Sequence, residues 1–303
     1  MSTRAKTLLK SLWWVLVLLF ISLFLYRNLG TAASVISRLP LGTLALAFAA
    51  ILLAKLLLAE VMRRALARFG IHFPYPDCFR MYNLTQLGKY IPGSVWQFLG
   101  RIALYRERGL NNRTIKDTLL LETFWVVFSA FAIGLLLVLI MQRTLIGSLL
   151  SQLPDYLTHP ATLTGTGLIL LSLLILWRKP LWVYARAYRF DTEILFVAVL
   201  IWLCLGFSFW ITLLPILDAQ PAFLYIVGLY ALSYAVGFVV PFAPAGIGIR
   251  EAVLVTGLLP FLDTGSAVVL ATLNRLGYIL AEILLVAFIG MKPNKRTKDP
   301  VHP

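Results

Sequence analysis

The sequence predicts an all-α, polytopic helical membrane protein with about 7–8 transmembrane helices, one or two of them re-entrant or broken. Two observations carry this prediction. Hydrophobic residues make up 60% of the 303-residue chain and charged residues only 13%, with a mean hydropathy of +0.87. The apolar residues also gather in runs of about 20, the length that crosses a bilayer core. This composition excludes an ordinary soluble domain.

The apolar runs predict a single membrane domain over residues 1–291, followed by a short basic tail over residues 292–303. The first run follows Arg4 and Lys6 but lacks a small-residue cleavage site, so we expect a retained helix and not a signal peptide. The predicted spans are Leu8–Tyr26, Leu41–Ala59, Thr118–Ile140, Leu163–Trp177, Glu193–Leu217, Ala222–Val240 and Ser266–Gly290.

Basic residues gather in the connections after the second and the fourth of these spans, and in the tail. The positive-inside rule places those connections in the cytoplasm, and both termini with them. The net charge of +14 is chiefly this cytoplasmic excess, which also suits anionic lipid headgroups. Nucleic acid is disfavoured as a partner, because no aromatic-rich soluble platform accompanies the basic residues.

Two short apolar segments are interrupted by proline and glycine: LGKYIPGSVWQFLGR, Leu87–Arg101, and the stretch Pro241–Pro260, which begins PFAPAGIGIRE. Irregular backbone at membrane depth survives only where protein or a water-filled cavity surrounds it. Each break also leaves backbone N–H groups at the start of the next helix, where anions bind favourably. We therefore expect two helix ends that shape a binding site. The residues expected to form the breaks are Pro92, Gly93, Pro244, Gly246 and Gly248.

Charged side chains inside the membrane are costly, so each one is a candidate functional residue. Arg275 and Glu282 are seven residues apart in one predicted helix and project from nearly the same face. Four of the candidates are cations (lysine or arginine) and three are carboxylates, so an anion could balance the excess positive charge. The alternative is that these residues only pair with one another and lock the bundle. The candidates are Lys89, Arg101, Arg250, Arg275, Glu122, Glu251, Glu282 and the neighbouring Asn274.

Other polar residues are interpreted as structural. Lys55 and Glu60 lie near the end of a predicted span, where the lysine stem reaches the interface. The three histidines have no second ligand at metal spacing, and the two cysteines make no disulfide framework, so neither a metal nor a cofactor is expected. GKYIPGS differs from a P-loop in the order of its residues, and no strand precedes it.

Four strings in order carry a resemblance to a known family: LGKYIPGSVWQFLGR, LLLE ending at Glu122, PFAPAGIGIREAVL, and LATLNRLGYILAE ending at Glu282. With them the chain resembles the family named after the transmembrane region of lysylphosphatidylglycerol synthases, also called flippase-like membrane proteins. The resemblance implies a bacterial or archaeal inner membrane protein. Aminoacyl transfer in the synthases belongs to a separate soluble domain that follows the membrane part, so no such activity is expected from this chain.

These observations favour a lipid-translocating protein that binds an anionic phospholipid or a polyprenyl-phosphate headgroup in a midplane cavity. Lys89, Arg101, Arg250 and Arg275 are expected to contact the phosphate, and the carboxylates to orient those cations or relay protons. One alternative is a membrane-embedded transferase with Glu122 or Glu251 as its base. Another is a non-transporting scaffold for a membrane glycosyltransferase or lipid-modifying partner.

Overall fold

The computed structural model describes residues 30–91, 95–141, 191–217, 221–240 and 243–291. Every regular element among these residues is helical, in agreement with the predicted all-α class. Several sequence predictions lie outside the described residues: the spans Leu8–Tyr26 and Leu163–Trp177, the break residues Pro92 and Gly93, and the basic tail over residues 292–303.

Four of the described helices are long and apolar enough to cross a membrane: α2 (Leu41–Ala67), α5 (Asn112–Met141), α9 (Thr192–Leu213) and α12 (Thr264–Met291). Each contains a predicted span, apart from the last few residues of Glu193–Leu217. A fifth apolar helix, α10 (Phe223–Val239), is shorter, with 17 residues. The chain is therefore a multi-pass membrane protein.

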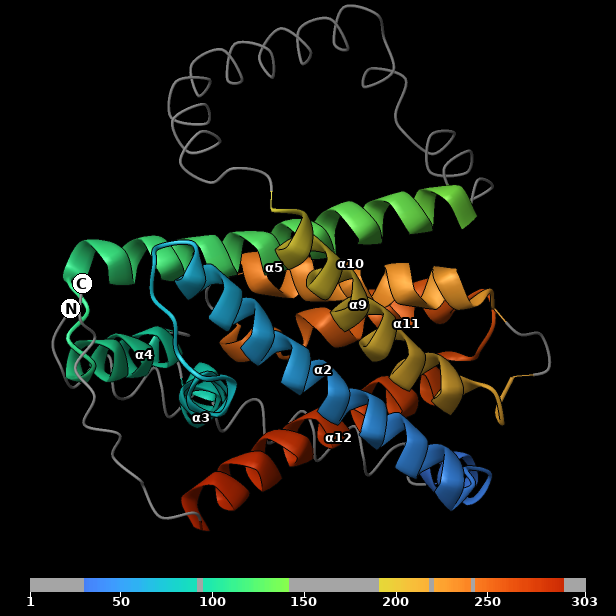
Figure 1. Ribbon diagram of the computed structural model, residues 1–303. Helices are drawn as coiled ribbons and strands as arrows, with labels where there is room; N and C mark the ends of the chain where they lie inside the picture. The colour runs from blue at the N-terminus through green and yellow to red at the C-terminus, as the bar shows by residue number, and fades with distance from the viewer. Residues whose placement is uncertain (1–29, 92–94, 142–190, 218–220, 241–242, 292–303) are drawn as a thin grey trace, which may run out of the picture.

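The helices pack around α9 and α10, which lie at the centre of the described fold (Figure 1). Helix α2 packs along α9, whereas α10 packs against both α5 and α9. Three shorter helices complete the arrangement: α3 (Tyr75–Gln86), α4 (Trp96–Glu107) and α11 (Ile249–Leu258). Because α11 contacts both α10 and α12, it connects the centre of the fold with the last helix.

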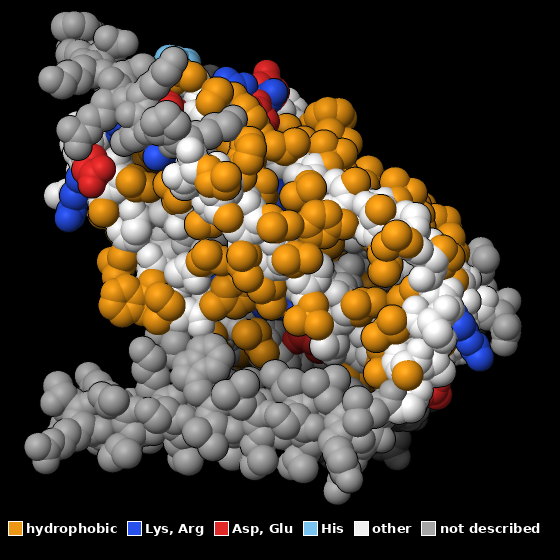
Figure 2. Space-filling view, turned by 90° about the horizontal axis from the view of Figure 1, so that it is seen from below, with side chains coloured by type: hydrophobic (Ala, Val, Ile, Leu, Met, Phe, Trp, Pro, Cys, Tyr) orange, Lys and Arg blue, Asp and Glu red, His pale blue; other side chains and the backbone are white. Residues whose placement is uncertain are grey.

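The outer surface of the described helices is apolar over much of its area. Figure 2 shows one face on which hydrophobic side chains predominate and most charged side chains lie near its edges. Large hydrophobic residues are exposed on α5, as at Phe124, Phe128 and Phe131, and on α12, as at Leu280 and Phe288. An apolar surface of this extent is suited to contact with lipid acyl chains.

The elements that flank both predicted interruptions are described. A 3₁₀ turn over Leu87–Tyr90 precedes the first, and α4, which begins at Trp96, follows it. The second contains a 3₁₀ turn over Pro244–Gly246 and ends at α11, which begins at Ile249 as expected. Gly246 and Gly248 have φ values of 69° and 85°, in the left-handed region that glycine adopts without a Cβ clash. The second break is therefore encoded by its glycines.

Replacing Gly134 with alanine is expected to destabilise the protein by about 1–3 kcal/mol, because α5 and α10 are in close contact at this position. A Cβ on Gly134 would lie 2.6 Å from the backbone nitrogen of Leu232, an atom that moves only with its helix. Thermal unfolding in detergent measures the effect. Gly277→Ala on α12 is the control, since its Cβ would meet only Ile51 at 3.6 Å. Equal stability of the two variants would contradict the close packing of α5 and α10.

Replacing Asp263 with alanine is expected to cost about 1 kcal/mol at pH 7, because this residue caps α12. Its Oδ1 accepts a hydrogen bond from the Ser266 N–H at 2.9 Å. The hydrogen bonds from Ser266 lower the pKa of the Asp263 carboxyl below its usual value. The pH-dependent part of its contribution is therefore complete above the unfolded-state pKa and is lost as pH falls through the lower, folded-state pKa.

The Asp263 prediction is tested by unfolding wild type and variant in detergent between pH 7 and pH 3. The difference in stability should narrow at the acidic end. Asp263→Asn keeps an acceptor at the same position, so it should lose little stability at pH 7 and show less pH dependence. A wild-type advantage that grows on acidification would have the wrong sign for a carboxylate cap.

Candidate functional site

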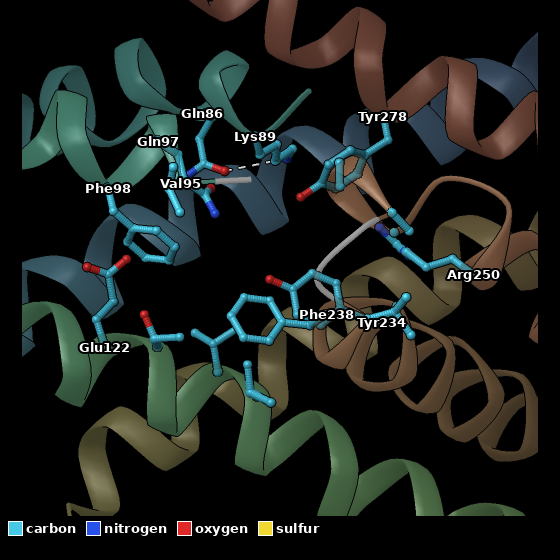
Figure 3. A pocket seen from close by; sticks show the side chains of 18 of the residues that line it. Gln86, Lys89, Val95, Gln97, Phe98, Glu122, Tyr234, Phe238, Arg250 and Tyr278 are labelled. Atoms are coloured by element: carbon cyan, nitrogen blue, oxygen red, sulfur yellow. Dashed lines mark hydrogen bonds between the residues drawn. The ribbon is translucent and has the colours of Figure 1, made fainter. Parts of the chain in front are cut away.

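The two interruptions meet at one cavity of about 260 Å³ (Figure 3). Ala243, Ala245 and Gly246 of the second break line it, as do Val95 and Gln97 at the start of α4. The remaining wall comes from helices α3, α5, α10, α11 and α12 and from Lys89 in the 3₁₀ turn over Leu87–Tyr90. The polar and charged side chains on the wall include Gln86, Lys89, Gln97, Arg101, Glu122 and Arg250, and the aromatic ones are Tyr82, Phe98, Tyr234, Phe238 and Tyr278.

Arg250 is a buried cation on the cavity wall, 6% exposed, in the first turn of α11. No carboxylate lies within ion-pair distance of its guanidinium in the described part of the chain, and its Nε is buried without a hydrogen-bond partner there. The guanidinium carbon lies 5.3 Å from the ring centre of Tyr230 and 5.2 Å from that of Tyr234. Aromatic faces attract a cation, but they do not satisfy its N–H donors.

The close contact between α10 and the Arg250 side chain depends on a glycine. A Cβ on Gly237 would lie 2.5 Å from Cγ of Arg250, so any larger residue there would displace the arginine. Both residues line the cavity. The position of this cation is therefore set by α10 as well as by its own helix.

A second buried cluster joins three helical segments. Glu282 on α12 accepts hydrogen bonds through Oε1 from Lys55 on α2 and from Lys89 in the first break. Lys55 and Glu282 are almost fully buried, whereas the Lys89 side chain is 13% exposed and lines the cavity. The Tyr278 ring lies beside both ammonium groups, with its centre 3.8 Å from Lys55 Nζ and 4.8 Å from Lys89 Nζ. Two lysines thus share one carboxylate.

The interpretation of Lys55 as an interfacial side chain is wrong. It assumed that the span ends at Ala59, whereas α2 continues to Ala67 and Lys55 lies in its middle. A lysine there cannot extend to the interface, and its ammonium group is instead buried against Glu282. Glu60 does lie nearer the helix end, where it pairs with Arg63 and Arg64.

Arg101 and Glu122 form a third buried group at the cavity wall. The Arg101 Nη1 donates to Glu122 Oε1 at 2.5 Å, and the guanidinium carbon lies 4.7 Å from the ring centre of Tyr82. The other carboxylate oxygen, Glu122 Oε2, is buried and has no hydrogen-bond partner among the described residues. One oxygen of the Glu122 carboxylate is therefore left without a hydrogen-bond donor among the described residues.

Glu251 and Arg275 lie behind the second break and shape it. Arg275 Nη2 donates to the carbonyl of Ala245 at 2.7 Å, and its Nε lies 3.7 Å from Glu251 Oε1. Glu251 Oε2 in turn accepts from the Gly248 N–H at 2.6 Å. A carboxylate of the protein therefore already occupies part of the helix end that was expected to offer free N–H groups to an anion.

The predicted residues thus divide into those on the cavity wall and those behind it. Lys89, Arg101, Arg250 and Glu122 line the cavity, as does Gly246. Arg275 and Glu282 contact lining residues without lining the cavity themselves, and Glu251 contacts Arg275 behind them. Asn274 does not reach the cavity: it donates to Ser208 on α9 at 3.3 Å, because it lies about 100° around α12 from Arg275.

The charged residues of this region leave a positive excess. With Lys55 included, five cations (Lys55, Lys89, Arg101, Arg250 and Arg275) face three carboxylates (Glu122, Glu251 and Glu282). The excess is therefore two positive charges when all groups are ionised. This is one more than the sequence indicated, because Lys55 had been assigned to the interface.

The sequence also missed the neutral wall of the cavity. Gln86, Gln97, Tyr234 and Tyr278 lie within or beside apolar runs and carry no charge to mark them. Tyr278 had one usable signal, since it stands between Arg275 and Glu282 in the same helix.

Comparison with known proteins adds no relative. No model of a protein family matches the chain, and no curated protein is detectably similar to it.

Proposed function

We propose that the cavity binds the phosphate of an anionic lipid, a phospholipid or a polyprenyl phosphate, and that the protein helps to move this lipid between membrane leaflets. The observation that carries the proposal is Arg250, a buried cation on the cavity wall with no ion-pair partner among the described residues. A buried charge without a partner is strongly unfavourable. A phosphate in the cavity would accept hydrogen bonds from the N–H groups of Arg250 that have no other acceptor among the described residues.

The chemistry of arginine favours a phosphate over a simple halide or a water molecule. The guanidinium presents a planar set of donors that matches two oxygens of a phosphate at once. Lys89, on the same cavity wall, adds a flexible ammonium group whose only carboxylate partner in the described fold is shared with Lys55. The two cations come from the two different interruptions, so a bound phosphate would bridge them.

The apolar part of the cavity favours a lipid over a free anion. Phe98, Val126, Val127 and Phe238 line the same cavity as the cations. Such side chains give an inorganic phosphate nothing to contact, whereas they suit the glycerol or isoprenoid portion next to a lipid phosphate. The surrounding helices are apolar enough to lie in a bilayer, where lipids are the available ligands.

Transport is preferred to catalysis because of how the candidate bases are placed. Glu122 accepts a hydrogen bond from Arg101, and Glu251 caps α11 beside Arg275. Both carboxylates are therefore already engaged by an arginine or a backbone N–H group, which fits a structural role better than the role of a general base. An inner-membrane location with cytoplasmic termini belongs to the same proposal.

The proposal is tested by replacing Arg250 with glutamine and measuring lipid translocation in proteoliposomes. Fluorescent phosphatidylglycerol is the probe, and its loss from the outer leaflet is followed by dithionite quenching. Losing a charge-assisted, bidentate contact should slow translocation by about 10- to 100-fold. Arg113→Gln, at an exposed arginine on α5, is the matched control and should transport at the wild-type rate.

Size-exclusion profiles and melting temperatures establish that each variant is folded. Arg250→Lys keeps the charge but loses the bidentate geometry, so it should fall between wild type and Arg250→Gln. A folded Arg250→Gln protein that moves lipid at the wild-type rate would remove the observation on which the proposal depends.

A further inference from the structure

The cavity has a second unsatisfied group on the side away from Arg250. Glu122 is 6% exposed and lies on α5, whereas Arg250 lies on α11. Figure 3 places the two side chains on opposite sides of the cavity. Glu122 Oε1 is bound to Arg101, but Oε2 is buried without a partner among the described residues. The cavity therefore offers donors at one end and an acceptor at the other.

A carboxylate oxygen accepts hydrogen bonds and cannot donate one when ionised. A bound phosphate would satisfy Arg250, but a phosphate cannot satisfy Glu122 Oε2, because both groups are acceptors and both are negative. Arg101 does not resolve this, since its Nη1 is directed at the other oxygen of Glu122 and its Nε makes no hydrogen bond to any described residue, Glu122 included. What Oε2 lacks is an N–H or O–H donor.

We propose that the cavity selects lipids whose headgroup carries a hydrogen-bond donor beyond the phosphate, an ammonium or a hydroxyl, which donates to Glu122 Oε2. This inference rests on the proposed function, because it requires the phosphate to bind near Arg250. A volume of about 260 Å³ lies just below the range of about 300–1,000 Å³ that holds drug-sized ligands. The space therefore suits a headgroup, with the acyl chains left outside.

The test compares short-chain lipids that differ only beyond the phosphate. Dihexanoyl phosphatidylmethanol has no donor, phosphatidylcholine has a cation without N–H donors, phosphatidylethanolamine has an ammonium, and phosphatidylglycerol has hydroxyls. Their dissociation constants for the purified full-length protein are measured below the lipids' critical micelle concentrations by tryptophan fluorescence. At least one donor-bearing lipid should bind about tenfold more tightly than phosphatidylmethanol and phosphatidylcholine. Which of the two does so identifies the donor as ammonium or hydroxyl.

Glu122→Gln then assigns the preference to this residue. This substitution removes the negative charge but keeps the shape of the side chain. If the preferred lipid carries an ammonium, the dissociation constant of phosphatidylmethanol divided by that of the preferred lipid should fall toward one. If it carries hydroxyls, this ratio should fall by a smaller factor, and Glu122→Leu should abolish the preference. Glu193→Gln, at an exposed carboxylate on α9, is the control and should leave the ratio unchanged.

The wild-type comparison decides the question even if the Glu122 variants do not fold. Equal affinity for all four lipids would overturn the selection by a donor. If all four lipids bind equally well but bind more weakly to Arg250→Gln than to wild type, the phosphate site would still be supported. Binding that is insensitive to Arg250→Gln would overturn the proposed function itself, so the two failures are distinguishable. A donor preference that persists in Glu122→Leu would also overturn the assignment to this residue.

Discussion

Replacing Glu282 with glutamine is expected to destabilise the protein by about 3–5 kcal/mol, the usual cost of removing one partner from a buried ion pair. The effect should be large here because two lysines depend on the same carboxylate. Lys55 is fully buried, and Lys89 is mostly so. After the substitution their ammonium groups would face each other without a counter-charge. Chemical unfolding in detergent, followed by tryptophan fluorescence, measures the loss.

The matched variant for Glu282→Gln is Lys55→Met, which removes one of the two lysines and leaves a one-to-one pair of Lys89 with Glu282. Methionine has a volume similar to that of lysine, and the substitution leaves no unpaired charge. The loss of stability should therefore stay within about 1.5 kcal/mol. Combining both substitutions should recover part of the loss seen in Glu282→Gln. Full stability of Glu282→Gln alone would mean that the cluster is not held by charge.

Replacing Arg101 with leucine is expected to cost a similar amount, about 3–5 kcal/mol, because it leaves Glu122 buried without its cation. Arg101 is 3% exposed and Glu122 is 6% exposed, so neither group can recover its hydration in place. The same unfolding assay applies. The lower stability should also reduce the yield of monodisperse protein.

A double-mutant cycle distinguishes this ion pair from simple packing. Arg101→Leu combined with Glu122→Leu removes both charges and leaves an apolar contact, which is often no worse than a buried ion pair. The double variant should therefore be more stable than Arg101→Leu. Additive losses in the double variant would show that the two side chains contribute independently.

The long helices were predictable because their signal is local. A run of apolar residues of the right length identifies a membrane span without any knowledge of its neighbours, as in Thr118–Ile140 within α5. The second interruption was predictable for the same reason, since glycines at positions 246 and 248 permit a backbone that other residues avoid. Proline and glycine act on their own chain segment.

The partners of the charged residues were not predictable, because they depend on packing between distant segments. Lys55 and Glu282 are 227 residues apart, and nothing in either segment indicates the other. The position of Lys55 was also misjudged because the end of its span was set too early, and an error of two helical turns moves a lysine from the membrane interior to its edge. The orientation of Asn274 toward Ser208 likewise depends on where α9 lies.

The contacts behind the second break form a closed circuit. It runs from the Ala245 carbonyl to Arg275, on to Glu251 and back to the Gly248 N–H, three residues along the chain from Ala245. Ala245 itself has a φ of 52°, an uncommon value for a residue other than glycine. Together these three contacts stabilise the backbone conformation of the turn between Ala245 and Gly248. Loss of Arg275 would therefore deform this part of the cavity wall from behind, whereas Arg250 lines the cavity itself.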